Sequence, residues 1–140
     1  MNTILVPLDG SALAEQALPY VRGLAALLGA RVLLLNVIAD TRDQGLMAES
    51  IAATYGAVDP LVTQREREQR SLTTLTQHAE SYLSSHAALL QGLGIDTEIE
   101  VSYGPAAEVI VEIAEGQRVA MIVMATHGYS GLKRWALGSV

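Results

Sequence analysis

The sequence of 140 residues contains no cysteine and no phenylalanine, and it contains only one tryptophan. Without cysteine the chain has no disulfides, no thiolate zinc ligands and no cysteine nucleophile. Fifteen acidic side chains outnumber nine basic ones and give a formal net charge of −6. This acidic balance, together with the shortage of aromatic stacking platforms, argues against a nucleic-acid-binding protein.

Long uninterrupted hydrophobic runs are also missing. The longest apolar region, residues 21–38, is broken by arginine, glycine and asparagine, whereas a membrane span needs about 20 predominantly apolar residues. The opening Met1-Asn2-Thr3 carries no positively charged side chain and does not resemble a secretory signal. These absences predict a cytoplasmic protein that has no membrane partner.

Half of the residues are hydrophobic, which excludes intrinsic disorder and supplies the core of one domain. Three segments, 3–8, 31–38 and 119–124, are apolar almost throughout, as is typical of buried strands, and the last is predicted to be central. Residues 95–101 alternate between apolar and acidic side chains, which indicates a strand near a sheet edge. These strands alternate with helical patterns, so we predict an α/β domain with a parallel sheet.

The helical patterns cover residues 11–28, 61–90 and 105–116. Ser11 is the expected N-cap of the first helix and Gly29 its stop. Pro19 lies inside this pattern, where proline costs about 3 kcal/mol, so we predict one continuous helix with a kink. Residues 40–60 show no sustained period and are predicted to form a long loop with one short helical turn.

Two strand ends carry residues suited to ligand binding. Asp9-Gly10-Ser11 follows the first strand, and residues 125–131 follow the fourth, with Gly138 and Ser139 further along. Ligands of open parallel sheets bind at the carboxyl ends of strands where the strand order reverses, and successive N–H groups in such loops bind anions. No strict P-loop and no G-x-G-x-x-G motif is present. The residues alone therefore leave two interpretations open, an anion site or ordinary turns.

The sequence offers no catalytic set. There is no G-x-S-x-G elbow, and the loop serines have no evident histidine and aspartate partners. His78 and His86 stand eight residues apart in one helical pattern without a further metal ligand at suitable spacing. We therefore expect neither catalytic residues nor a metal site built from protein side chains.

The pattern after the fourth strand resembles the signature of the ATP-binding branch of the universal stress protein family. That signature is Gly, two residues, Gly, nine residues, Gly, then Ser or Thr; here Ala125-Thr126-His127-Gly128 precedes nine residues and Gly138-Ser139. The opening ILVPLDGS, the element ALPYVRGLA and two further motifs, Leu35-Asn36-Val37 and Tyr103-Gly104-Pro105, agree with the family in order along the whole chain. Ala125 replaces the first glycine, and we expect extended backbone there, which alanine tolerates.

The resemblance implies a three-layer α/β sandwich with an open, Rossmann-like parallel sheet of strand order 3-2-1-4-5, formed by residues 1–140 as one nucleotide-binding domain. Family members usually continue through a helix into a fifth strand, so this strand is expected to be missing from the chain. The resemblance also implies that ATP binds together with Mg²⁺ and that the protein forms a homodimer.

The resemblance assigns nucleotide-binding roles by position. Asp9 is expected to accept hydrogen bonds from adenine or ribose, and the Val37 backbone to meet the adenine. Gly138 and Ser139 are expected to hold phosphates. The complete implied set is Pro7, Asp9, Val37, Met124, Ala125, His127, Gly128, Gly138, Ser139 and Val140.

Three functions are compatible with these residues. The preferred one is an ATP-binding regulatory module in the stress response. A slow ATPase is an alternative, although the sequence shows no positioned general base or arginine clamp for phosphoryl transfer. The other alternative is a nucleotide-independent stress-response dimer, as in the branch of the family that lacks the glycine signature.

Overall fold

The structure is a computed structural model that describes residues 2–39 and 64–125. The predicted loop at 40–60 lies outside the described residues. In chain order the elements are β1 (Thr3–Pro7), α1 (Ala12–Glu15), α2 (Leu18–Leu28), β2 (Arg31–Ile38), α4 (Gln64–Gly92), β3 (Thr97–Tyr103), α5 (Ala106–Gly116) and β4 (Met121–Ile122).

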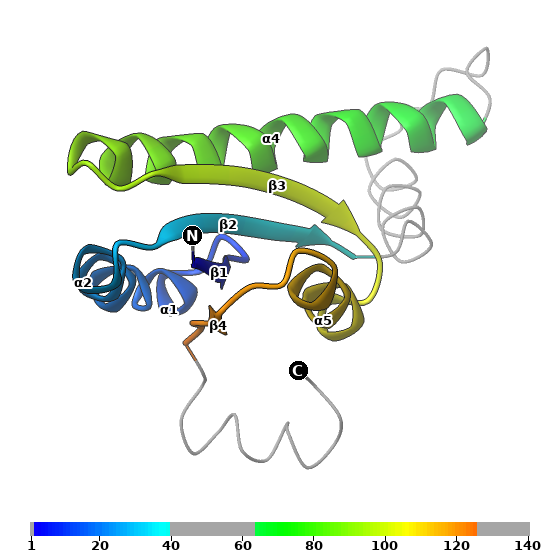
Figure 1. Cartoon of the computed structure of the whole chain (residues 1–140). Coiled ribbons are helices and arrows are strands. Elements are labelled where there is room, and N and C mark those ends of the chain that lie inside the picture. Colours follow the sequence, from blue (N-terminus) through cyan, green and yellow to red (C-terminus); the bar gives the residue numbers. More distant parts are fainter. Residues whose placement is uncertain (1, 40–63, 126–140) are drawn as a thin grey trace.

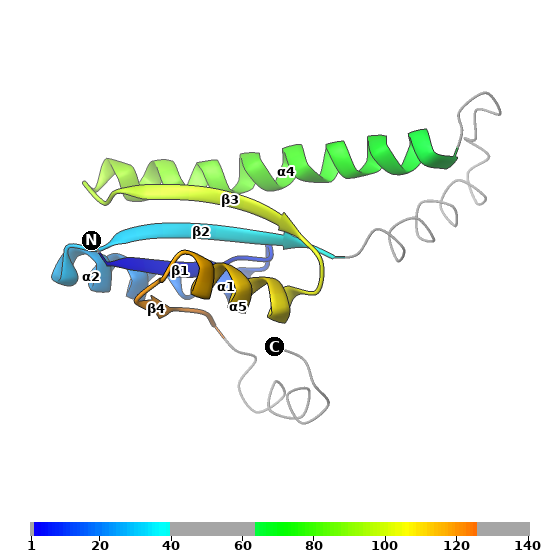
Figure 2. The ribbon, with the colours of Figure 1, turned by 45° about the vertical axis from the view of Figure 1, so that its right-hand side comes forward.

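The strands form one parallel sheet in the order β3-β2-β1-β4. Helices cover it on both faces, and α4 runs along β3 and past its end (Figures 1 and 2). This arrangement confirms the α/β sandwich and the strand order 3-2-1-4. The described residues show no fifth strand. Among them β4 pairs with β1 alone, so the central position that the sequence predicts for this strand is not seen in the described sheet.

The alternation of side chains along β1 and β2 divides the core into two layers. One layer joins these strands to α2 and α4 through Ile4, Val6, Val32, Leu34, Val21, Ala25, Leu83, Ala87 and Leu90. The opposite layer joins them to α5 through Leu5, Leu33, Leu35 and Ile110. Strands that are buried on both faces are apolar throughout, which explains the continuous run of residues 31–38.

The first helical pattern is two helices and not the single kinked helix that we predicted. The helix stops at Glu15 and restarts at Leu18, so that Pro19 falls in the first turn of α2. Proline is tolerated there because the N–H groups of a first turn have no partner within the helix. Ser11 is the N-cap of α1, and Gly29 ends α2 in the left-handed conformation with φ of 57°, as expected.

The second half of the chain shows smaller differences from the prediction. β3 begins at Thr97 and continues to Tyr103, two residues later at each end than expected. Its edge position is confirmed, and Glu98 accepts a hydrogen bond from Arg31 of β2 at 3.0 Å. Pro105 is the N-cap of α5 rather than its first residue. The charged residues 65–70 near the start of α4 are exposed.

None of the helices among residues 2–39 and 64–125 has the length and apolar character that crossing a bilayer requires.

Replacing Leu34 by alanine should destabilise the protein by about 2–5 kcal/mol, because this side chain fills the core between the sheet and its helices. Its exposed fraction is 0%, whereas that of Leu27 on α2 is 81%. The matched variant Leu27→Ala should change the free energy of unfolding by no more than about 0.5 kcal/mol. Urea denaturation of both variants measures the difference, and equal losses would contradict the assigned core.

Candidate functional site

A pocket of about 140 Å³ opens where β1, β2 and β4 end. It lies at the reversal of the strand order, since β2 lies on one side of β1 and β4 on the other. The residues that line it come from these strand ends and from α1 and α5: Pro7, Leu8, Asp9, Ala14, Leu35, Val37, Ala106, Ile110, Met124 and Ala125.

The pocket brings together half of the residues that the sequence singled out. Pro7, Asp9, Val37, Met124 and Ala125 all line it. The other five lie outside the described residues, namely His127, Gly128, Gly138, Ser139 and Val140. The sequence did not identify Ala14, Ala106 or Ile110 as part of the site, because their place depends on how the helices pack.

The pocket is small, and nine of its ten lining residues are apolar. Sites for complete drug-sized ligands measure about 300–1,000 Å³, whereas an apolar cavity of about 150 Å³ holds a single benzene ring. The described walls therefore fit the flat ring of a ligand. Asp9 is the one residue with a charged side chain among the lining residues, so a hydrogen-bonding edge of that ring or its substituent would face this carboxylate.

A tight turn carries Asp9 to the mouth of the pocket. Gly10 has φ of +87°, a conformation that glycine adopts without steric cost. The Asp9 Oδ1 atom accepts hydrogen bonds from the Ser11 backbone N–H at 2.9 Å and from the Ser11 hydroxyl at 2.5 Å. Ser11 Oγ in turn accepts from the Ala14 N–H at 3.1 Å. Ser11 thus links the Asp9 carboxylate to the start of α1.

Asn36 fixes the carboxyl end of β1. Its Nδ2 donates a hydrogen bond to the carbonyl oxygen of Leu8 at 2.8 Å, and the Leu8 N–H donates to the Leu35 carbonyl at 2.8 Å. These two bonds extend the pairing of β1 and β2 up to the turn. The sequence placed Asn36 in a family motif, but it did not predict this role.

The chain leaves β4 in an extended course toward the pocket. The Val123 N–H donates to the Leu5 carbonyl at 2.9 Å, which carries the pairing with β1 one residue past β4. Ala125 has an ordinary backbone, because Arg118 is the one non-glycine residue with positive φ in the described part of the chain. Alanine therefore fits where the family signature has glycine, as expected.

Three polar side chains meet beneath the Asp9 turn. The Nε2 atom of His86 lies 2.8 Å from Oε1 of Glu15, and the Tyr82 ring contacts the His86 ring edge-on with centroids 4.9 Å apart. The Tyr82 hydroxyl oxygen is buried. Burial, followed by the negative charges of Glu15 and Asp9, raises the pKa of Tyr82 to about 12.

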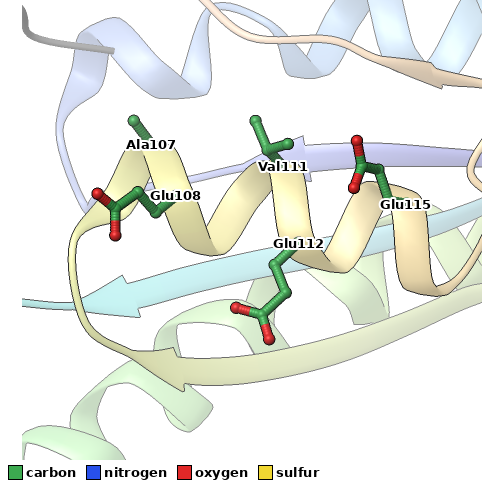
Figure 3. Close-up of a pocket in the computed structure, with 5 residues that line it drawn as sticks. All are labelled: Ala107, Glu108, Val111, Glu112 and Glu115. Atoms are coloured by element: carbon green, nitrogen blue, oxygen red, sulfur yellow. The ribbon is translucent and has the colours of Figure 1, made fainter.

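A second hollow, of about 460 Å³, lies on the outer side of α5 (Figure 3). All five lining residues come from this one helix: Ala107, Glu108, Val111, Glu112 and Glu115. Three carboxylates surround Val111, so the hollow repels anions. It is therefore not a site for a phosphate-bearing ligand.

Within residues 2–39 and 64–125, no three histidine, aspartate or glutamate side chains gather in a way that could hold a metal ion.

The sequence model of the universal stress protein family matches residues 1–140. This chain belongs to the universal stress protein family. It is 31% identical over 137 residues to universal stress protein MJ0577 of Methanocaldococcus jannaschii, a match covering 98% of this chain and 83% of that protein. Universal stress protein MJ0531 of the same organism is 30% identical, with 98% and 71% covered.

Solved structures show the same fold. The structure of MJ0577, described as a structure-based assignment of biochemical function, aligns with a TM-score of 0.69 at 28% identity and covers 95% of this chain and 80% of that one. A universal stress protein in complex with cAMP aligns with a TM-score of 0.64 at 18% identity, with 99% and 86% covered. The α/β sandwich of this universal stress protein is thus the fold of its relatives.

Replacing Tyr82 by phenylalanine should remove one tyrosine that ionises near pH 12. The protein has five tyrosines, and Tyr20, with an exposed fraction of 72%, provides the matched control variant Tyr20→Phe. The ultraviolet absorbance of tyrosinate, measured across alkaline pH, distinguishes the Tyr82→Phe variant from the Tyr20→Phe variant. A transition near pH 12 that persists in Tyr82→Phe would contradict the assignment.

The same shift predicts a loss of stability at alkaline pH. The folded pKa of about 12 lies above the ordinary value of 10.0, so the folded state holds the phenol proton more tightly than the unfolded chain. The stabilisation that the protonated Tyr82 phenol gives the folded state is complete below pH 10, and it is lost as the pH rises from 10 toward 12. Chemical denaturation at several pH values should show a smaller loss for Tyr82→Phe than for the unmodified protein.

Proposed function

We propose that this universal stress protein binds ATP at the pocket where β1, β2 and β4 end and acts as a nucleotide-dependent regulatory module in the stress response. The observation that carries the proposal is the convergence of Pro7, Asp9, Val37 and Met124 on one apolar pocket. These residues come from three strand ends, and the family resemblance implies that they bind the nucleotide.

The chemistry of the pocket suits the adenosine part of the ligand. The apolar walls cover the faces of a flat base, while the Asp9 carboxylate accepts hydrogen bonds from an amino or hydroxyl group. A phosphate group would gain less from such walls, because it offers no flat apolar surface. Among known structures of this fold, one is a complex with cAMP, which is also an adenine nucleotide.

The triphosphate is assigned to the glycine pattern that follows β4 in the sequence. Gly128, then Gly138 and Ser139 after nine residues, match the spacing of the ATP-binding branch. Glycine lets backbone N–H groups approach phosphate oxygens closely. Mg²⁺ would arrive with the nucleotide, since phosphates and water supply most of its usual ligands. The homodimer and the cytoplasmic location remain predictions, and light scattering of the purified protein tests the former.

Isothermal titration of the full chain with ATP and Mg²⁺ should show saturable binding. Replacing Asp9 by alanine should weaken it about tenfold, because a charged acceptor of the ligand is lost. Glu112→Ala removes a carboxylate from the outer side of α5 and should leave the affinity unchanged. An absence of heat at millimolar nucleotide overturns the proposal, and it would favour the nucleotide-independent dimer.

Filling the pocket should block the ligand without removing any polar group. Ala106 lines the pocket, whereas its neighbour Ala107 lines the outer hollow of the same helix turn. Ala106→Leu is therefore expected to weaken ATP binding strongly, and Ala107→Leu to leave it near the unmodified value. The same titration measures both variants, and equal affinities would place the ligand elsewhere.

A further inference from the structure

We propose that His86 and Tyr82 of α4 are positioning residues for the ligand, because they hold the turn between β1 and α1 that presents Asp9 to the pocket. This inference rests on the proposed function and adds to it a support that lies outside the pocket. Neither residue lines the pocket.

Helix α1 is too short to be stable by itself. This helix has only four residues, Ala12–Glu15, and isolated helices shorter than about 12 residues are marginal in water. It is also cut off from α2, which restarts at Leu18. A contact from another element is therefore needed to hold α1 in place.

His86 supplies that contact. Its Nε2 atom lies 2.8 Å from Oε1 of Glu15, the last residue of α1, and both side chains are part-buried, with exposed fractions of 18% and 33%. A hydrogen bond to a carboxylate in such a place is stronger than one in open solvent. If His86 is removed, the Glu15 carboxylate loses this partner, and the end of α1 is released from α4.

A short chain of hydrogen bonds connects α1 to Asp9. Ser11 caps the helix by accepting from the Ala14 N–H, and it donates to Asp9 through both its N–H and its hydroxyl. One turn of helix therefore separates the Glu15 contact from the carboxylate at the pocket. Movement of α1 shifts Ser11 and reorients Asp9.

Tyr82 stands one helical turn before His86 and supports the same junction. Its ring meets the imidazole edge-on at an interplanar angle of 76°, which restricts the orientation of His86. Its hydroxyl is buried and makes no hydrogen bond within the described residues, so it is the ring that supports His86. The raised pKa of this phenol agrees with its place among the two carboxylates of the turn.

The test combines ATP titration with hydrogen exchange of the backbone amides of residues 9–16. His86→Ala should weaken ATP binding about fivefold and speed exchange in this segment, because the turn is released. His86→Gln should stay within about twofold of the unmodified protein, since the glutamine amide can still donate to Glu15. Tyr82→Leu, which removes the ring that restricts His86, should fall between the two.

His78→Ala provides the matched control. His78 lies on the same helix with an exposed side chain, so its loss should change neither the ATP affinity nor the exchange of residues 9–16. Circular dichroism of each variant verifies that α4 remains folded. If His86→Ala loses the fold, Tyr82→Leu still decides the question, because it leaves the pair of His86 and Glu15 in place and removes only the ring that orients His86.

Two outcomes overturn different parts of the account. Unchanged affinity and unchanged exchange in His86→Ala and Tyr82→Leu, in a protein that binds ATP, overturn the positioning role alone. A failure of the unmodified protein to bind ATP overturns the proposed function, and the positioning role for a nucleotide falls with it. In that case faster exchange of residues 9–16 in His86→Ala would still establish the contact of α4 with the turn.

Discussion

The burial of β1 and β2 on both faces is the constraint on which the rest of the structure depends. Helices must cover each face, and Leu5 contributes to one layer of the core while Ile4 and Val6 contribute to the other. A shift of one residue in the register would exchange the two layers and place each side chain against the wrong helix. The register therefore also fixes which residues arrive at the carboxyl edge of the sheet.

The pocket follows from this arrangement. Pro7 reaches the edge because it ends β1, and Val37 because it is the next-to-last residue of β2. The hydrogen bonds of Asn36 and Leu8 continue the pairing of these two strands. Met124 arrives from the other side of β1 because the strand order reverses there. Three separate parts of the chain thus line one apolar pocket. The one charged side chain among its lining residues, that of Asp9, lies on the turn after β1. A ligand with flat faces and a polar edge matches this division.

The turn itself has little stability of its own, since it leads into a helix of four residues. Its support comes from α4, which packs on the same face of the sheet as α2 and brings His86 against Glu15. The long helix therefore contributes to the core through its apolar side and to the site through polar residues at its boundary. In this member of the universal stress protein family, the geometry of the site and the packing of α4 are linked.

The sequence by itself determined the types of the elements and several of their ends, because these depend on local patterns. The apolar run of residues 31–38, the Ser11 cap and the Gly29 stop are examples. The family resemblance, together with the rule for strand ends, also indicated Asp9 and Ala125 before their common pocket was known. The break before Pro19 was missed, since a proline inside an apolar period is compatible with either a kink or a restart. Only the tertiary structure decided that Glu15 and His86, 71 residues apart, would meet, or that Ala106 and Ile110 would complete the pocket. Such contacts depend on which helices share a face of the sheet, and no local pattern of residues carries that information.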